Sequence, residues 1–403
     1  MNKKIYIKKL FPKIVIFFLI SSLFWFVSVK IVSYVDTVDS DFFSFWLAGR
    51  VIQKGLNPYN EQVWIEGHYI YDADWVSDKA FLYPLYLGLF MIPISHFDLN
   101  TSYGIWVWIS QLLIFLSGVY LIISTISHRS HYFLFPIIAG IILFRPLFPL
   151  LLSGQIAALL LFILVLSLYL TKKHLDFLGG LTLSLLSIKP NIAIPLLFFI
   201  SIYLLVTKRY QFLLGIVVGL LSLFLLAWIA QPNWFIDYFY VLVSKQTSTF
   251  GYSPSIWGLA FLITGGKIES TITISLLFCF IILVYYVRSI LLSKEQDPLQ
   301  AISLSIAIAV FITPYIWPYD QIILIVPIIF IIANLIKKRY PYLISATFFL
   351  LIDLFSLIIL LYSQQIQKEN LQSLIPLTLI IILFILPSPN VIKSIEQATH
   401  TQS

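Results

Sequence analysis

The sequence predicts an all-α polytopic membrane protein, and three observations lead to this prediction. First, 60% of the 403 residues are hydrophobic and the mean hydropathy is +0.96. Second, only 11% of the residues are charged, whereas a soluble domain carries about a quarter. Third, long apolar stretches alternate with short basic patches along the chain. A helix needs about 20 such residues to cross a bilayer.

The basic patches predict the orientation. Sixteen of the 25 Lys and Arg residues fall in seven patches, and loops rich in these residues stay cytoplasmic. Both termini are therefore expected inside. The net charge of +7 is then a topology signal rather than a nucleic-acid-binding surface. The patches lie at 3–13, Arg129, 172–173, 208–209, 288–294, 337–339 and Lys393.

The first apolar stretch, 11–35, follows a basic segment as in a signal peptide. It is too long for one and no small-residue cleavage site follows it, so we expect an uncleaved first span. Residues 36–102 are then external, which suits their nine acidic and three basic residues. Within them, 81–95 is apolar but only about 15 residues long, too short for a ~30 Å core. We expect juxtamembrane helices there.

The later spans bring the total to about twelve in one integral membrane domain, 1–403. A second external segment, 232–269, is rich in Trp, Tyr and Phe, as is typical of the headgroup interface. The expected spans after the first are 103–126, 132–150, 154–171, 175–189, 191–206, 211–231, 270–290, 299–316, 319–336, 341–362 and 373–389.

This topology brings polar residues from distant parts of the chain to the outer membrane face, where a site is predicted. Each of them also has a purely structural interpretation. Asp39 and Asp41 suit the start of a helix that Gly55 and Pro58 end. Gln155 and Asp320 can likewise cap helices. The residues expected at this face are Asp39, Asp41, Tyr83, Gln155, Lys189, Trp317 and Asp320.

Two cations near this face are candidates for binding a phosphate. Lys189 precedes Pro190 between two apolar runs, where it is either a snorkelling lysine or a phosphate partner, since a charge at membrane depth usually faces a cavity or a counter-ion. Arg145 contacts either lipid headgroups or the same phosphate. Asp353, inside the span 341–362, is an intramembrane carboxylate without an assigned role.

Several familiar motifs are absent from the sequence. It has no glycine-rich phosphate loop, no Cys/His metal cluster and no Gly-x-Ser-x-Gly. The single cysteine, Cys279, excludes an intrachain disulfide. We therefore expect no metal and no cofactor.

The ordered motifs of this chain resemble glycosyltransferase family 87, the DUF2029 group of polytopic enzymes with a GT-C fold. Departures include Leu85 and Ala157, where many members have Pro and Asn. The matching pieces are Asp41-Phe42, Phe45-Trp46, Ala48-Gly49, Gly55, Asn57-Pro58-Tyr59, Tyr83-Pro84, Gly154-Gln155, Gly180, Lys189-Pro190, Thr313-Pro314-Tyr315, Trp317 and Tyr319-Asp320.

The resemblance implies transfer of a sugar, mannose-like or a pentose, from a polyprenyl-phosphate donor to a lipid or glycan acceptor. Asp41 matches the acidic general base of the family, and the implied reaction inverts the anomeric carbon at the outer leaflet. From the absence of large loops we expect a multi-pass protein of a cell inner membrane. Lys189 and Arg145 are implied to bind the donor phosphate. The remaining substrate-binding candidates are Asp39, Trp46, Tyr83, Gln155, Asn191, Tyr315, Trp317 and Asp320.

Two other function classes stay open. A lipid or sugar transporter or flippase would carry out no chemistry, but such proteins often show paired halves and broken helices at the midplane, and no halves are visible here. A polysaccharide polymerase or ligase is expected to have a large late external loop with arginines, whereas 232–269 contains only Lys245 and Lys267 as basic residues.

Overall fold

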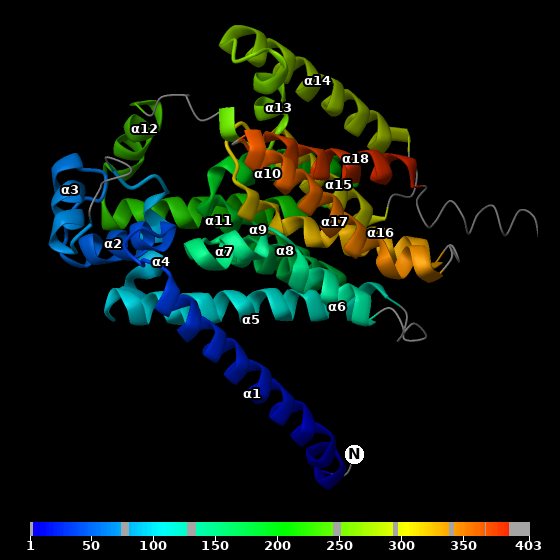
Figure 1. Cartoon of the computed structure of the whole chain (residues 1–403), viewed down its shortest axis with the longest axis horizontal. Helices are drawn as coiled ribbons and strands as arrows, with labels where there is room; N and C mark the ends of the chain where they lie inside the picture. Colours follow the sequence, from blue (N-terminus) through cyan, green and yellow to red (C-terminus); the bar gives the residue numbers. More distant parts are fainter. Residues whose placement is uncertain are drawn as a thin grey trace, which may run out of the picture.

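A computed structural model describes residues 3–73, 80–126, 134–244, 251–292, 297–337, 342–366 and 368–386. Over these ranges the protein consists of helices and contains no strand, which confirms the all-α class (Figure 1). Of the basic patches, five residues lie outside the described ranges: Arg129, Lys294, Lys338, Arg339 and Lys393.

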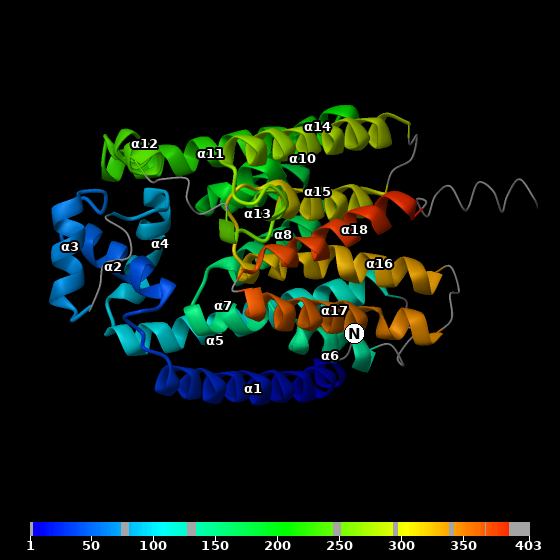
Figure 2. The ribbon, with the colours of Figure 1, turned by 45° about the horizontal axis from the view of Figure 1, so that its top comes forward.

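Four helices gather at one end of the long bundle, at the left of Figures 1 and 2. Three of them come from the expected external loop 36–102 and the fourth from 232–269, so these two segments lie together. The 11-residue α4 is too short to cross a membrane, as expected for a juxtamembrane helix. The four helices are α2 (Asp41–Gln53), α3 (Glu61–Ile70), α4 (Leu85–Ser95) and α12 (Trp234–Ser244).

The bundle itself contains helices that run mostly along its length (Figure 1). They are α1 (Lys3–Tyr34), α5 (Leu99–Thr125), α6 (Leu134–Leu143), α7 (Leu147–Ser153), α8 (Ala157–Lys172), α9 (Asp176–Ser184), η2 (Leu185–Ile188), α10 (Pro190–Val206), α11 (Tyr210–Ala230), α13 (Ile256–Ile263), α14 (Ile268–Leu292), α15 (Pro298–Ile312), η4 (Pro318–Leu324), α16 (Ile325–Lys337), α17 (Tyr342–Ile366), η5 (Asn370–Ser373) and α18 (Leu374–Ile385).

Six described helices are long and apolar enough to span a membrane, or seven if a bent pair counts as one. The count of twelve is therefore not confirmed, and the location of the termini stays a prediction. Several expected spans are helices of 10–17 residues, and helices of this length are shorter than a ~30 Å hydrocarbon core.

The sequence predicts one span over 132–150, but its described part is α6 and α7 with a 46° bend at the Arg145-Pro146 break. Proline explains this break because it cannot continue the hydrogen bonding of a helix.

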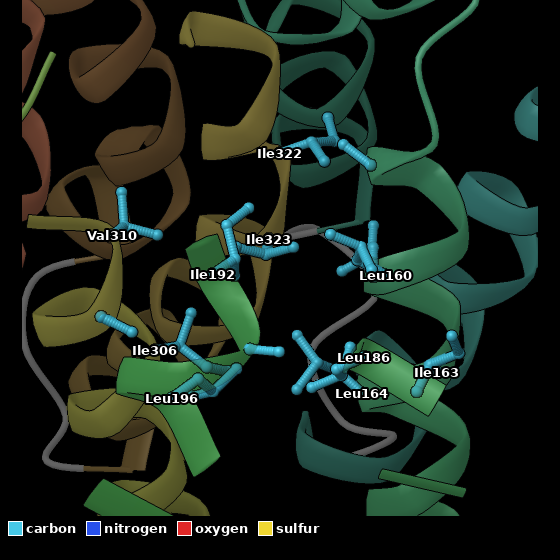
Figure 3. Close-up of a cluster of buried hydrophobic side chains, with 14 of the residues drawn as sticks. Leu160, Ile163, Leu164, Leu186, Ile192, Leu196, Ile306, Val310, Ile322 and Ile323 are labelled. Carbon is cyan, nitrogen blue, oxygen red and sulfur yellow. The ribbon is translucent and has the colours of Figure 1, made fainter. Parts of the chain in front are cut away.

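A buried apolar cluster joins the helices that carry the predicted site. Figure 3 shows Leu160 and Leu164 of α8, Leu186 of η2 and Ile192 of α10 facing Ile323 of η4. All five side chains are at most 1% exposed. This core fixes the start of α8, the end of η2 and the starts of α10 and η4 relative to one another.

Helices α9 and α11 pack backbone to backbone through glycines. A Cβ on Gly180 would lie 2.0 Å from the carbonyl oxygen of Phe212, and one on Gly215 would lie 2.1 Å from that of Phe177. Neither carbonyl can move without moving its helix. Small residues that let helices approach this closely are a common means of association in membranes.

Helix α1 packs on α5, where the side-chain amide of Gln111 donates a hydrogen bond of 2.8 Å to Ser28. It then diverges from α5 toward its N-terminal end (Figure 1).

Replacing Gly215 with Ala is expected to destabilise the protein by about 1–3 kcal/mol, because the new methyl group forces α9 and α11 apart. Gly118→Ala is the matched control, since its Cβ would meet only the tip of Ile141, at 3.1 Å. Both changes gain the same helix propensity. Thermal unfolding in detergent measures the difference, and equal melting temperatures would contradict the tight packing.

The orientation can be tested in a Cys279→Ser background, since Cys279 is the sole cysteine. A membrane-impermeant maleimide should label Tyr69→Cys on exposed α3 in intact cells. It should label Tyr210→Cys, next to the basic patch 208–209, only after lysis. The reverse pattern of labelling would invert the topology.

Candidate functional site

Close packing brings Asp41 and Gln155 into the same region. The ring of Phe42 stacks on Trp106, and the indole of Trp106 donates to the carbonyl of Gly154 at 2.8 Å. Gly154 has φ +64°, and a Cβ there would lie 2.6 Å from the Cβ of Phe42. Only glycine accepts both the backbone angle and this contact without strain. The segment preceding α8 is thereby held against the first turn of α2.

A buried ion pair lies at the centre of the site. The ammonium of Lys189 hydrogen-bonds to Oδ1 of Asp320, and the two side chains are 3% and 0% exposed. The same ammonium donates to Oε1 of Gln155 at 3.2 Å and lies 4.8 Å from the ring centroid of Tyr319. The Gln155 amide nitrogen donates to the Tyr319 hydroxyl at 3.1 Å. Four side chains from three segments thus form one network.

Breaks in the helices aim these side chains inward. Lys189 leaves helical geometry between η2 and α10, with φ −129° and ψ 81°, and Pro190 then begins α10. Proline is favoured at a first helical position, where its missing N–H costs nothing. Pro318 begins η4 in the same way, and Oδ2 of Asp320 accepts from the backbone N–H of Trp317 at 3.1 Å. Asp320 is therefore both a cap and a counter-ion.

Asp41 is exposed, unlike the ion pair, and lies close enough to act on the network through its charge. It interacts electrostatically with the hydroxyls of Tyr83 and Tyr319 and with Asp320. Burial raises the pKa of Tyr83 well above its usual value, and the charge of Asp41 raises this pKa further. Tyr83 therefore keeps its proton at neutral pH and offers a hydrogen bond beside a carboxylate.

The segment 313–317 is fixed by contacts to α10. The side-chain amide of Asn191 donates to the carbonyl of Tyr315 at 2.6 Å, and the hydroxyl of Thr313 donates to the carbonyl of Asn191. The Trp317 indole donates to the Tyr315 hydroxyl at 2.8 Å. Asn191 therefore positions this aromatic segment, and its amide nitrogen is already bonded to protein.

Other predicted residues lie elsewhere or are already paired. Trp46 is 1% exposed and donates to the carbonyl of Phe97 at 3.1 Å, so it has no surface for a substrate. Arg145 pairs with Glu369 at 2.6 Å. Asp39 is exposed just before α2. Both carboxylate oxygens of Asp353, on α17, are buried and without a hydrogen-bond partner among the described residues.

The role of Lys189 as a phosphate partner stays a prediction, and the structure gives its ammonium a protein counter-ion. Its charge is neutralised by Asp320 and its side chain is buried. Conversely, the sequence points to Tyr319 only as part of a family motif, yet it is the network member that reaches the site surface. Its position beside Asp320 in an aromatic stretch is the only other signal for it in the sequence. Within the described residues, no group of three His, Cys, Asp or Glu side chains could hold a metal.

Comparison with known proteins matches this chain to the sequence model of glycosyltransferase family 87 over residues 81–317, more than half its length. The chain belongs to glycosyltransferase family 87. The matched range includes Tyr83, Gln155 and Lys189 but not Asp41 or Asp320. No curated protein matches, and no solved structure matches. Family 87 membership and the long apolar helices make this a membrane glycosyltransferase.

Breaking the buried pair should be costly in this family 87 enzyme. Lys189→Met leaves Asp320 as an uncompensated buried charge, and Asp320→Asn does the same to Lys189. Each change is expected to destabilise the protein by about 3–5 kcal/mol. The double variant Lys189→Met/Asp320→Leu should recover most of this loss, because it leaves no buried charge. Unfolding in detergent measures all three variants.

The control for this cycle is the ion pair between Arg209 and Asp176, with side chains 22% and 25% exposed. Asp176→Asn is expected to cost no more than about 1 kcal/mol, because solvent screens this pair. Equal losses for Asp320→Asn and Asp176→Asn would show that the Lys189 pair is not dry.

Proposed function

We propose that this protein transfers a sugar from a polyprenyl-phosphate donor to a lipid or glycan acceptor at the extracytoplasmic face of a cell inner membrane. The observation that supports this most directly is the exposed carboxylate of Asp41 beside the buried Lys189 network, at the end of the bundle where α2, α3, α4 and α12 gather. The family supplies the reaction class.

In the proposed mechanism Asp41 is the general base. It takes the proton from the acceptor hydroxyl as that oxygen attacks the anomeric carbon of the donor sugar. The bond from this carbon to the phosphate oxygen breaks, and polyprenyl phosphate leaves with the electron pair. Attack opposite to the leaving group inverts the anomeric carbon. A carboxylate oxygen can accept the proton of the acceptor hydroxyl as charge develops there, which suits this role.

The leaving phosphate needs positive charge or hydrogen-bond donors. Lys189 can supply charge only if Asp320 releases it. The Nη1 atom of Arg145 is buried and has no hydrogen-bond partner among the described residues, while another nitrogen bonds Glu369, so a phosphate that reached it would complete its hydrogen bonding. We therefore assign the phosphate contact to Arg145 first, with Lys189 mainly positioning Gln155 and Tyr319.

Asp41→Asn is expected to lower sugar transfer by roughly 10²–10⁴-fold, because the amide cannot accept the proton. The fold should be unaffected, since the side chain is exposed. Membranes containing the protein are supplied with polyprenyl-phosphate sugars radiolabelled in the sugar, and label reaching a new product is counted.

Asp36→Asn is the matched control, since Asp36 is also exposed and only caps a turn by accepting from the backbone N–H of Val38 at 3.1 Å. It should transfer at the wild-type rate. Full activity of Asp41→Asn would remove Asp41 from the chemistry. Wild-type protein that transfers from no polyprenyl-phosphate sugar would contradict the proposed function itself.

A further inference from the structure

The hydrogen bonds through Gln155 have a fixed direction. An ammonium has only donors, so Lys189 must face the amide oxygen of Gln155, at 3.2 Å. The amide nitrogen then faces the hydroxyl of Tyr319, at 3.1 Å. An amide nitrogen donates and does not accept. The Tyr319 hydroxyl is therefore the acceptor, and its own proton points away from Gln155.

Tyr319 is the member of the network that reaches the surface. Gln155, Lys189 and Asp320 are at most 3% exposed, whereas Tyr319 is partly exposed. Over the described residues its hydroxyl makes no hydrogen bond except the one from Gln155. The charge of exposed Asp41 acts on this hydroxyl. The Tyr319 hydroxyl thus has a proton that no described residue accepts, and it lies within range of the charge of Asp41.

We propose that Tyr319 is a substrate-binding residue that donates its phenol hydrogen bond to a carbohydrate hydroxyl beside Asp41. This rests on the proposed function. Donors bonded in series polarise one another, so the Lys189 charge strengthens the outward hydrogen bond of Tyr319 although the ammonium itself stays buried.

Charge favours a neutral hydroxyl over a phosphate oxygen as the partner. Lys189 and Asp320 cancel, which leaves the negative charge of Asp41 facing Tyr319. That charge repels an anion. A sugar hydroxyl can accept from Tyr319 and donate to Asp41 at the same time. The hydroxyl belongs to the donor sugar or to the acceptor, which share this chemistry.

Tyr319→Phe tests the proposal, because it removes the hydroxyl and keeps the ring near Lys189. With polyprenyl-phosphate [¹⁴C]mannose as donor and octyl mannoside as acceptor, kcat/KM is expected to fall roughly ten- to a hundredfold. Tyr286→Phe is the matched control. Its hydroxyl donates to the carbonyl of Phe199 at 2.8 Å and contacts Ser305, in another part of the bundle, so its loss should leave kcat/KM unchanged. Equal kcat/KM for Tyr319→Phe and wild type overturns the proposal.

Monodeoxy acceptors identify which sugar is held. If Tyr319 binds the acceptor, one monodeoxy octyl mannoside lowers the transfer rate of wild type as much as Tyr319→Phe lowers the rate with octyl mannoside. Tyr319→Phe with that monodeoxy acceptor then shows no further loss of rate. If Tyr319 binds the donor, Tyr319→Phe raises KM for the donor alone. Each monodeoxy acceptor then lowers the transfer rate of wild type and of Tyr319→Phe by the same factor. If Tyr319 has only a structural role, Tyr319→Phe does not selectively raise the KM for the donor or for the acceptor, and that result counts against the proposal.

A binding measurement separates this inference from the proposed function. If wild-type protein transfers no mannose, its thermal unfolding in detergent is followed with a panel of octyl glycosides. A stabilising shift that is smaller in Tyr319→Phe supports carbohydrate binding at Tyr319 even without transfer. Equal shifts in both proteins, or no shift with any glycoside, overturn it.

Discussion

The ion pair between Lys189 and Asp320 is the interaction on which the rest of the site depends. Burying two charges costs several kcal/mol each, and this cost is offset only when the pair is close and fully hydrogen-bonded. Here Lys189 bonds Asp320 and Gln155, while Asp320 also accepts from the backbone of Trp317. The pair therefore holds the start of α10, the start of η4 and the approach to α8 in one arrangement.

In this arrangement the buried and the exposed side chains have different roles. The buried members set position and hydrogen-bond direction, and we propose that the exposed ones, Asp41 and in part Tyr319, carry out chemistry and binding. Ile192 and Ile323 follow Lys189 and Asp320 closely in the chain, and both are buried in the apolar cluster of Figure 3. A dry network beside an exposed carboxylate is the feature that links the fold to glycosyl transfer.

Much of the site could be predicted from the sequence, because orientation follows from basic loops. The patches 172–173 and 208–209 alone predict that Gln155 and Lys189 lie at the same membrane face. The basic loops could not predict which side chains at this face form ion pairs with one another. Nothing in the sequence separates a snorkelling Lys189 from one neutralised by Asp320, since the contact spans 131 residues. The same limit applies to Trp46, whose burial depends on how α2 packs on α4. It also applies to the span 132–150, whose break at Pro146 interrupts an apolar run of ordinary appearance.

The most direct test of this account is an electron cryomicroscopy structure of the protein with polyprenyl phosphate bound. The account predicts that the phosphate contacts Arg145 rather than Tyr319, with Lys189 still bonded to Asp320. A phosphate bound instead at the opposite end, beside Lys172 or Arg209, would contradict it.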